Sequence, residues 1–282
     1  MINTNQRKAG SILVVVSAIV FSSAGIFTNG VSTDAWGVIF WRGVAAAAFT
    51  LTYLVLRGAL LVEIRAFNKP AFLVTVMGAA GTAAFIPAFK LSSVANVTLI
   101  YAAAPFIAAG LSWAFIKELP TTRVILASLG AFFGVLIIVS ASFGGSQLKG
   151  DFLALFITLM MSGTMAVYRK FPSTTAALPA ALSSIVLLPF ALAYGNPLVV
   201  QSHERPILIA FGLVFAVASV TLSEGARRLP SAETALLSTL EMPLAPVLAF
   251  LVLSEVPTSS AILGGAVIFL AVVWSQRHIA KH

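Results

Sequence analysis

Charged residues and cysteine are scarce in this sequence. Asp, Glu, Lys and Arg make up 9% of the 282 residues, against about 25% in soluble domains. Apolar residues make up 59%, and the mean hydropathy is +1.02. A soluble protein of this length needs more polar surface than this chain can supply. We therefore expect most apolar side chains to face lipid.

The absence of cysteine excludes disulfides, thiolate metal sites, cysteine nucleophiles and iron–sulfur clusters. The histidines, His203, His278 and His282, fall in expected loops or near the carboxyl terminus. No Walker-type phosphate loop is present, so this chain cannot use ATP directly. The sequence predicts no metal ion and no cofactor. It also argues against an enzyme, which needs a nucleophile and a base that converge at one site.

The long apolar runs predict membrane-spanning helices. They are about 20 residues long, unlike the roughly 10-residue alternating strands of a membrane barrel. Gly, Asn and Pro residues separate them, as expected for loops. The expected helices cover residues 10–29, 34–56, 71–89, 94–116, 122–141, 151–170, 175–194, 207–227, 231–253 and 258–276. The predicted fold class is an all-α membrane protein with ten transmembrane helices.

The distribution of basic residues supports this count. If the amino terminus is cytoplasmic, the opposite side receives only Lys90, Lys149 and Arg205, and Arg42 lies within a helix. The cytoplasmic side receives the rest: Arg7, Lys8, Arg57, Arg65, Lys69, Lys117, Arg123, Arg169, Lys170, Arg227, Arg228, Arg277 and Lys281. A wrong helix count would destroy this alternation. We therefore expect both termini in the cytoplasm, and no nucleic-acid partner despite the net charge of +8.

Residues 90–120 and 228–257 resemble each other. Both begin with a basic residue and Leu, continue through a Ser and a mid-helix Pro, and end in a Glu-x-Pro turn. These positions are Ser93, Pro105, Glu118 and Pro120 in the first copy, and Ser231, Pro243, Glu255 and Pro257 in the second. With five helices in each half, 1–141 and 142–282 would be inverted repeats, as in many secondary transporters. The alternative is a chance alignment of two Ala- and Leu-rich helices.

These motifs resemble the drug/metabolite transporter superfamily, specifically its EamA-type ten-helix carriers. The resemblance covers nearly the whole chain, with Gly130-x-x-x-Gly134 and Gly264-Gly265 in the fifth helix of each copy. Within the family, the Trp41-Arg42 pair and Glu241-Met242-Pro243 are most similar to the YddG-type amino-acid exporters. The resemblance implies a multi-pass protein of the bacterial inner membrane that exports amino acids, including aromatic or hydrophobic ones, or related metabolites.

Glu241 is the first candidate for a transport residue, because ionisable groups inside a membrane span are costly. It lies about eleven residues into the ninth expected helix, near the middle of the bilayer. Thr234, Ser238 and Glu241 share one helical face. Pro243 is expected to leave the carbonyl of Thr239 without its helical partner. Together these groups suit an ammonium group or a proton, whereas a structural ion pair with Arg42 is the alternative.

Arg42 lies at a similar depth in the second expected helix. Its guanidinium could bind the carboxylate of a substrate, or it could neutralise Glu241 and pack the bundle. A zwitterion inserted between the two charges combines both interpretations. Glu224 and Glu233 are interpreted as structural. Glu224 can pair with the arginines one turn later, and Glu233 lies in a first helical turn, where the helix dipole favours an anion.

Aromatic and small polar residues add weaker candidates. Tyr101 and Trp41 could contact a substrate, as could Phe85, although packing or lipid contact is the alternative for each. Ser22 and Ser162 occupy matching positions in the first and sixth expected helices. Such small residues either line a pathway or allow close helix packing.

These observations favour a secondary transporter that moves an amino acid or a related metabolite by alternating access. Its partners would be a small-molecule substrate and the lipid bilayer, and one chain could form the pathway as a monomer. A carrier for another organic solute or a drug remains an alternative. A membrane receptor or assembly protein that transports nothing is the alternative from a different class.

Overall fold

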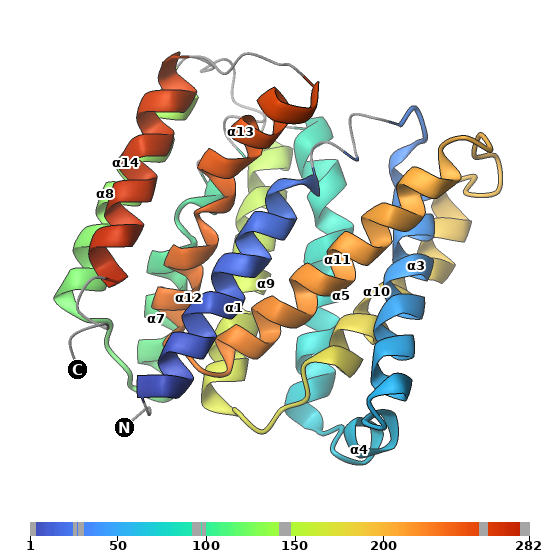
Figure 1. Cartoon of the computed structure of the whole chain (residues 1–282), viewed down its shortest axis with the longest axis horizontal. Coiled ribbons are helices and arrows are strands. Elements are labelled where there is room, and N and C mark those ends of the chain that lie inside the picture. The colour runs from blue at the N-terminus through green and yellow to red at the C-terminus, as the bar shows by residue number, and fades with distance from the viewer. Residues whose placement is uncertain are drawn as a thin grey trace.

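The chain folds into a bundle of packed helices (Figure 1). The computed structural model describes residues 4–24, 27, 31–91, 97, 100–140, 148–253 and 259–276, and these ranges contain no β-strand. The helices are α1 (Thr4–Ser22), α3 (Ala35–Leu56), α4 (Leu60–Arg65), α5 (Lys69–Leu91), α7 (Ala104–Ile116), α8 (Thr122–Ser140), α9 (Leu148–Lys170), α10 (Ala177–Tyr194), α11 (Arg205–Ala226), α12 (Ser231–Ser238), α13 (Glu241–Leu253) and α14 (Ser259–Gln276).

The helices fit a multi-pass membrane protein. By length and composition, α3, α9, α10 and α11 can each cross a membrane. Shorter apolar helices cover residues 69–85, 104–116, 122–137 and 262–276. The prediction of an all-α membrane protein is thus confirmed for the described residues, whereas the count of ten spans stays a prediction.

Two of the expected helices are interrupted. Residues 94–116 and 231–253 were each expected to be continuous, but turns occur at Ala102–Ala103 and at Thr239–Leu240. α7 begins at Ala104 and α13 at Glu241, so that Pro105 and Pro243 lie in the first turn of a new helix. A first helical turn needs no backbone N–H donor from proline, whereas a helix interior does. The prolines therefore start new helices instead of kinking continuous ones.

The helix packing has an internal symmetry. We name α1, α3, α5, α7 and α8, with the segments between them, the first set, and α9, α10, α11, α12–α13 and α14, with the segments between them, the second set. The pairs α3–α10, α7–α12 and α8–α14 each join equivalent members of the two sets. The next largest contacts between the sets exchange in pairs: α5–α9 with α1–α11, α5–α10 with α3–α11, and α7–α9 with α1–α12. Exchanging the sets therefore preserves the main contacts between them. Ser93, Glu255 and Pro257 lie outside the described residues.

Close helix packing depends on small residues. A Cβ atom on Gly134 of α8 would lie 2.6 Å from the carbonyl oxygen of Gly264 on α14, and one on Gly130 would lie 3.2 Å from the Cβ of Ala271. The interpretation of Gly130-x-x-x-Gly134 as a packing motif is confirmed. Where lipid replaces water, such close contacts supply much of the attraction between helices.

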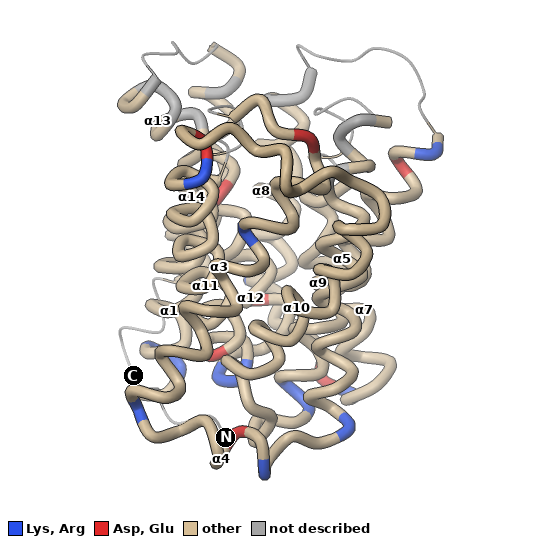
Figure 2. Tube along the Cα trace, turned by 90° about the vertical axis from the view of Figure 1, so that its right-hand side faces the viewer, with Lys and Arg blue, Asp and Glu red and all other residues tan. Residues whose placement is uncertain are grey.

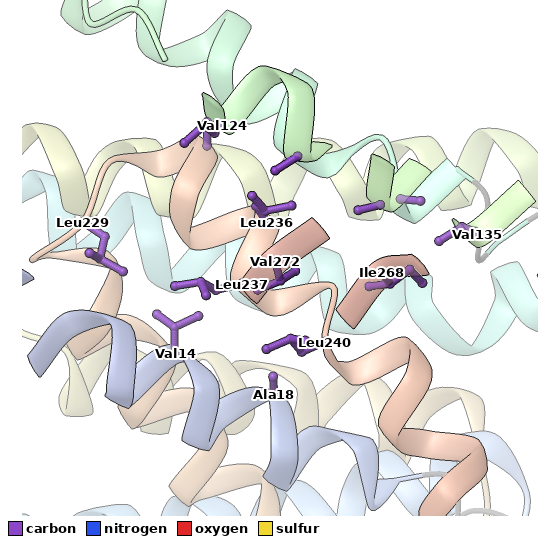
Figure 3. Close-up of a cluster of buried hydrophobic side chains, with 14 residues drawn as sticks. Val14, Ala18, Val124, Val135, Leu229, Leu236, Leu237, Leu240, Ile268 and Val272 are labelled. Atoms are coloured by element: carbon purple, nitrogen blue, oxygen red, sulfur yellow. The ribbon is translucent and has the colours of Figure 1, made fainter. Parts of the chain in front are cut away.

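A buried apolar cluster joins α1, α8, α12 and α14 (Figure 3). Val14 and Ala18 on α1 face Leu237 and Leu240, and Ile268 of α14 packs from the other side. Ala102, in the turn before α7, belongs to the same cluster as Leu240, in the turn before α13. The two helix interruptions are thus connected by one packed core.

Lys and Arg residues gather at one end of the bundle, which we name the basic end (Figure 2). The start of α1, the short helix α4 and the loop between α11 and α12 all lie there (Figure 1). α3 and α11 begin at the opposite end (Figure 1).

Candidate functional site

Arg42 of α3 is buried in an aromatic environment. Only 8% of the surface of this residue is exposed. The guanidinium carbon is 4.3 Å from the ring centroid of Phe215 and 5.4 Å from that of Phe211, both on α11. Phe215 contacts Phe21 edge to face at 5.8 Å. A cation over aromatic faces is attracted by about 0.5–2 kcal/mol for each ring.

No carboxylate neutralises Arg42 among the described residues. The ion pairs found there are Arg7–Glu233, Arg169–Glu118, Arg227–Glu224 and Arg228–Glu224. The Nε of Arg42 is buried and has no hydrogen-bond partner. The alternative of a structural pair between Arg42 and Glu241 is therefore not what the structure contains. A buried cation without a carboxylate is costly, which makes this position suited to an anionic ligand.

Glu241 is the first residue of α13, directly after the turn that interrupts this span. Its side chain is half-buried. The carboxylate lies within electrostatic range of the Tyr101 hydroxyl, and Tyr101 directly precedes the turn before α7. The structure thus brings these two predicted residues together at the paired interruptions. Broken helices of this kind form the substrate and ion sites of many transporters.

The polar groups near Glu241 are mostly satisfied by their own helix. Thr234 donates its hydroxyl hydrogen to the carbonyl of Pro230 at 3.1 Å, and Ser238 donates to Thr234 at 3.0 Å. The expectation that the carbonyl of Thr239 has no hydrogen-bond partner is wrong, because the N–H of Met242 donates to it at 3.1 Å. The turn forms the shorter bond from residue i to i−3 that a tightened helix end makes.

Ser162 and Ser22 are both buried, but they bond differently. Ser162 of α9 donates to the carbonyl oxygen of Ala104 at 3.2 Å, which connects α9 to the first residue of α7. Ser22 donates to Ile19 of its own helix at 2.6 Å. Only Ser162 therefore reaches one of the interrupted spans by a hydrogen bond.

Trp41 packs against the buried cluster that contains Phe211, whereas Phe85 lies on α5. The indole N–H of Trp41 donates to the carbonyl of Pro197 at 2.7 Å, in the loop after α10. The guanidinium of Arg205 lies 5.9 Å from the Trp41 ring. Phe85 of α5 is 44% exposed. Trp41 thus contacts Arg42 only indirectly, through the cluster of Phe211.

Phe211 and Phe215 were not predicted from the sequence. Their spacing of four residues on α11 puts both rings on one helical face. That spacing was a detectable signal, although the chain has 21 Phe residues and the spacing alone does not identify Arg42 as the partner.

The interpretation of Glu224 and Glu233 as structural agrees with their contacts. Glu224 pairs with Arg227 at 2.7 Å and with Arg228 at 2.5 Å, as expected from their spacing. Glu233 is 1% exposed and pairs with Arg7 at 2.6 Å. Its main partner is thus a cation of α1, and Gln276 donates to its other oxygen at 3.2 Å.

A comparison of the sequence with models of protein families identifies the family of this chain. The model of the EamA-like transporter family matches residues 8–140 and again residues 148–276. The chain belongs to the EamA-like transporter family. Its two matches are two EamA repeats, within the drug/metabolite transporter superfamily named in the sequence analysis.

Solved structures agree on the fold. One crystal structure aligns with this EamA-like protein with a TM-score of 0.81 over 98% of this chain and 100% of the other. The two sequences are 15% identical, so the likeness concerns the fold alone. No curated protein matches the chain. Membership of this family indicates a membrane transporter of small solutes.

Proposed function

We propose that this chain is a secondary carrier that exports amino acids, preferentially aromatic or hydrophobic ones, or closely related metabolites. The observation that carries the proposal is the buried guanidinium of Arg42, which lies between Phe211 and Phe215 without a carboxylate partner among the described residues. A planar guanidinium binds a carboxylate through two parallel hydrogen bonds. The neighbouring phenyl rings offer an apolar surface to a hydrophobic side chain.

Glu241 is the proposed partner for the ammonium group or for a coupled proton. It is the half-buried carboxylate at the start of α13, and Tyr101 lies within electrostatic range of it. Ser238, Thr234 and Ser162 line the adjoining helix segments in this proposal. Trp41 packs against the cluster of Phe211 beside Arg42, and Ser22 and Phe85 belong to other parts of the pathway in this proposal. A zwitterion would thus meet opposite charges on two different helices.

The proposed mechanism is alternating access around the interface of two inverted five-helix repeats. The packing supports this proposal, because the main contacts between the two helix sets are preserved when the sets are exchanged. The gathering of basic residues at one end supports an orientation with both termini in the cytoplasm of a bacterial cell. A single chain supplies both helix sets, so a monomer suffices for transport.

The experiment is a flux measurement in liposomes. Purified protein is reconstituted, and the movement of labelled amino acids is followed with and without a pH gradient for the wild type and Glu241→Gln. Saturable flux above that of empty liposomes, lost in Glu241→Gln, is the expected result. Glu224→Gln is the matched control, because Glu224 pairs with Arg227 and Arg228, directly after its own helix.

Each other outcome is informative. Unchanged flux in Glu241→Gln would make Glu241 structural. No flux for any amino acid would reject the substrate class and direct the search to other organic solutes or drugs. Specific binding without any flux would favour a receptor.

A further inference from the structure

Glu63 connects the two helix sets at the basic end. It lies on α4, between α3 and α5, and its Oε2 accepts a hydrogen bond from the backbone N–H of Leu178 at 2.7 Å. Leu178 is in the first turn of α10, whose N-cap residue Ala176 provides no side-chain cap. Free N–H groups at a helix start need an acceptor. A glutamate of the first set thus caps a helix of the second set.

Glu204 makes the reciprocal contact at the opposite end. It directly precedes α11 and accepts hydrogen bonds from the N–H of Ser32 at 2.6 Å and from its hydroxyl at 2.8 Å. The Thr33 hydroxyl donates to its other oxygen. These residues lead into α3. Glu204 is 3% exposed, so a glutamate of the second set holds the start of a helix of the first set.

The two contacts are equivalent under exchange of the helix sets. Each glutamate lies between the second and third helices of its own set, and each binds the start of the second helix of the other set. Their chain separations are 115 and 172 residues, so neither contact is local. α3 and α10, the two helices whose starts are held, also pack against each other. The contacts therefore lie at opposite ends of one helix pair.

The charges around the two glutamates differ. Neither carboxylate belongs to the ion pairs of the described residues. Burial raises the pKa of Glu63, nearby Glu224 adds to this effect, and the Leu178 amide and Arg227 oppose it. The Thr33 hydroxyl and the Ser32 amide and hydroxyl lower the pKa of Glu204 to about 2, and His203 acts in the same direction. The Glu204 contact is thus the more firmly ionised of the two.

We propose that Glu63 and Glu204 are paired positioning residues that hold the two repeats together at opposite faces of the membrane, so that the face whose contact is released is the face that opens. This inference rests on the proposed carrier function. In alternating access, the repeats separate at one face while they remain closed at the other. One matched contact at each end, made between the repeats and not within them, meets this requirement.

The test uses spin-label distances, because the chain contains no cysteine that would compete for the label. One double-cysteine protein carries labels at the exposed residues Leu56 and Ser173, across the basic end. A second carries them at the exposed residues Leu91 and Val199, across the opposite end. Distance distributions are recorded in lipid nanodiscs without any substrate, so a failure of the amino-acid assignment does not affect the result.

Opposite responses are expected. Glu63→Gln should increase the population of long distances for the Leu56–Ser173 pair alone, and Glu204→Gln for the Leu91–Val199 pair alone. The glutamine oxygen can still accept a hydrogen bond but carries no charge, and this weakening corresponds to roughly a tenfold change in the open-to-closed ratio. Glu224→Gln, at the same end as Glu63 but paired with the two arginines that directly follow α11, should not increase the long distances of either pair.

A milder variant covers the case in which Glu204→Gln does not fold. Thr33→Val removes one donor to Glu204 and keeps the side-chain shape, and it should shift the Leu91–Val199 pair in the same direction by a smaller factor. Distributions that do not change, or that change at the wrong end, would overturn the proposal.

Discussion

The guanidinium of Arg42 lies 4.3 Å from the centre of the Phe215 ring. This contact crosses from α3 to α11, two helices that pack closely at Gly212. It places a buried cation against an aromatic face instead of against a carboxylate. The proposed binding of a substrate carboxylate depends on this arrangement, because a cation already paired with an acidic side chain would have less to offer an anion.

Phe215→Leu should destabilise the protein by about 1–2 kcal/mol. The leucine retains apolar volume, but the attraction between the ring and the Arg42 guanidinium is lost. Thermal unfolding in detergent would measure the change. Phe133→Leu is the control, since Phe133 is 60% exposed on α8 and is expected to contact lipid. Equal effects of the two substitutions would contradict a role for the Phe215 ring beside Arg42.

Gly212→Ala should be destabilising by about 1–3 kcal/mol. A Cβ atom there would lie 2.8 Å from the backbone nitrogen of Ala46 and 2.8 Å from the carbonyl oxygen of Arg42. Backbone atoms cannot move aside cheaply, so α11 would be displaced from α3. Gly110→Ala is the matched control, because nothing lies within 4 Å of its added Cβ. A Gly212 variant as stable as the Gly110 variant would show that the helices are less tightly packed than described.

Arg7→Gln should cost about 3 kcal/mol, the lower end of the range for breaking a buried pair. Glu233 would remain buried at 1% exposure with only Gln276 beside it, whereas Arg7 itself is 34% exposed. The double variant Arg7→Gln with Glu233→Gln should recover part of the loss, since no uncompensated charge remains. A double-mutant cycle of unfolding free energies checks this. Simple additivity of the two losses would refute the coupling.

Glu204 should make stability depend on pH in the acidic range. Its hydrogen bonds lower its pKa from 4.5 to about 2. The stabilisation is therefore fully present above pH 4.5, and it is lost as the pH falls toward 2. Melting temperatures measured across this window should decline more steeply for the wild type than for Glu204→Gln. Parallel curves for the two proteins would be the contrary result.

The sequence predicted the helix ends well where turn residues flank an apolar run. The expected range 175–194 corresponds to Ala177–Tyr194, which ends before Gly195. The interruptions at Ala102–Ala103 and Thr239–Leu240 were not predicted. A proline is compatible with either a kink or a new helix start, and only the surrounding packing decides between them.

The partners of charged residues were harder to predict than the residues themselves. Arg42 and Glu241 were identified because ionisable groups are rare in membrane spans. That Arg42 faces Phe215 depends on the rotation of α3 against α11, which hydropathy does not determine. The contacts of Glu63 and Glu204 join segments that are 115 and 172 residues apart in the chain, and no local pattern marks them.

The central claim is that Arg42 binds the carboxylate of a transported amino acid. The most direct measurement is inhibition of labelled amino-acid flux in liposomes by unlabelled analogues, compared between the wild type and Arg42→Lys. In the wild type, an analogue whose carboxylate is replaced by a neutral amide should fail to compete, whereas the free acid competes. Arg42→Lys keeps the charge but loses the two-pronged geometry, so it should weaken competition by the free acid by roughly tenfold or more. Equal competition by acid and amide, or an unchanged Arg42→Lys protein, would contradict the account.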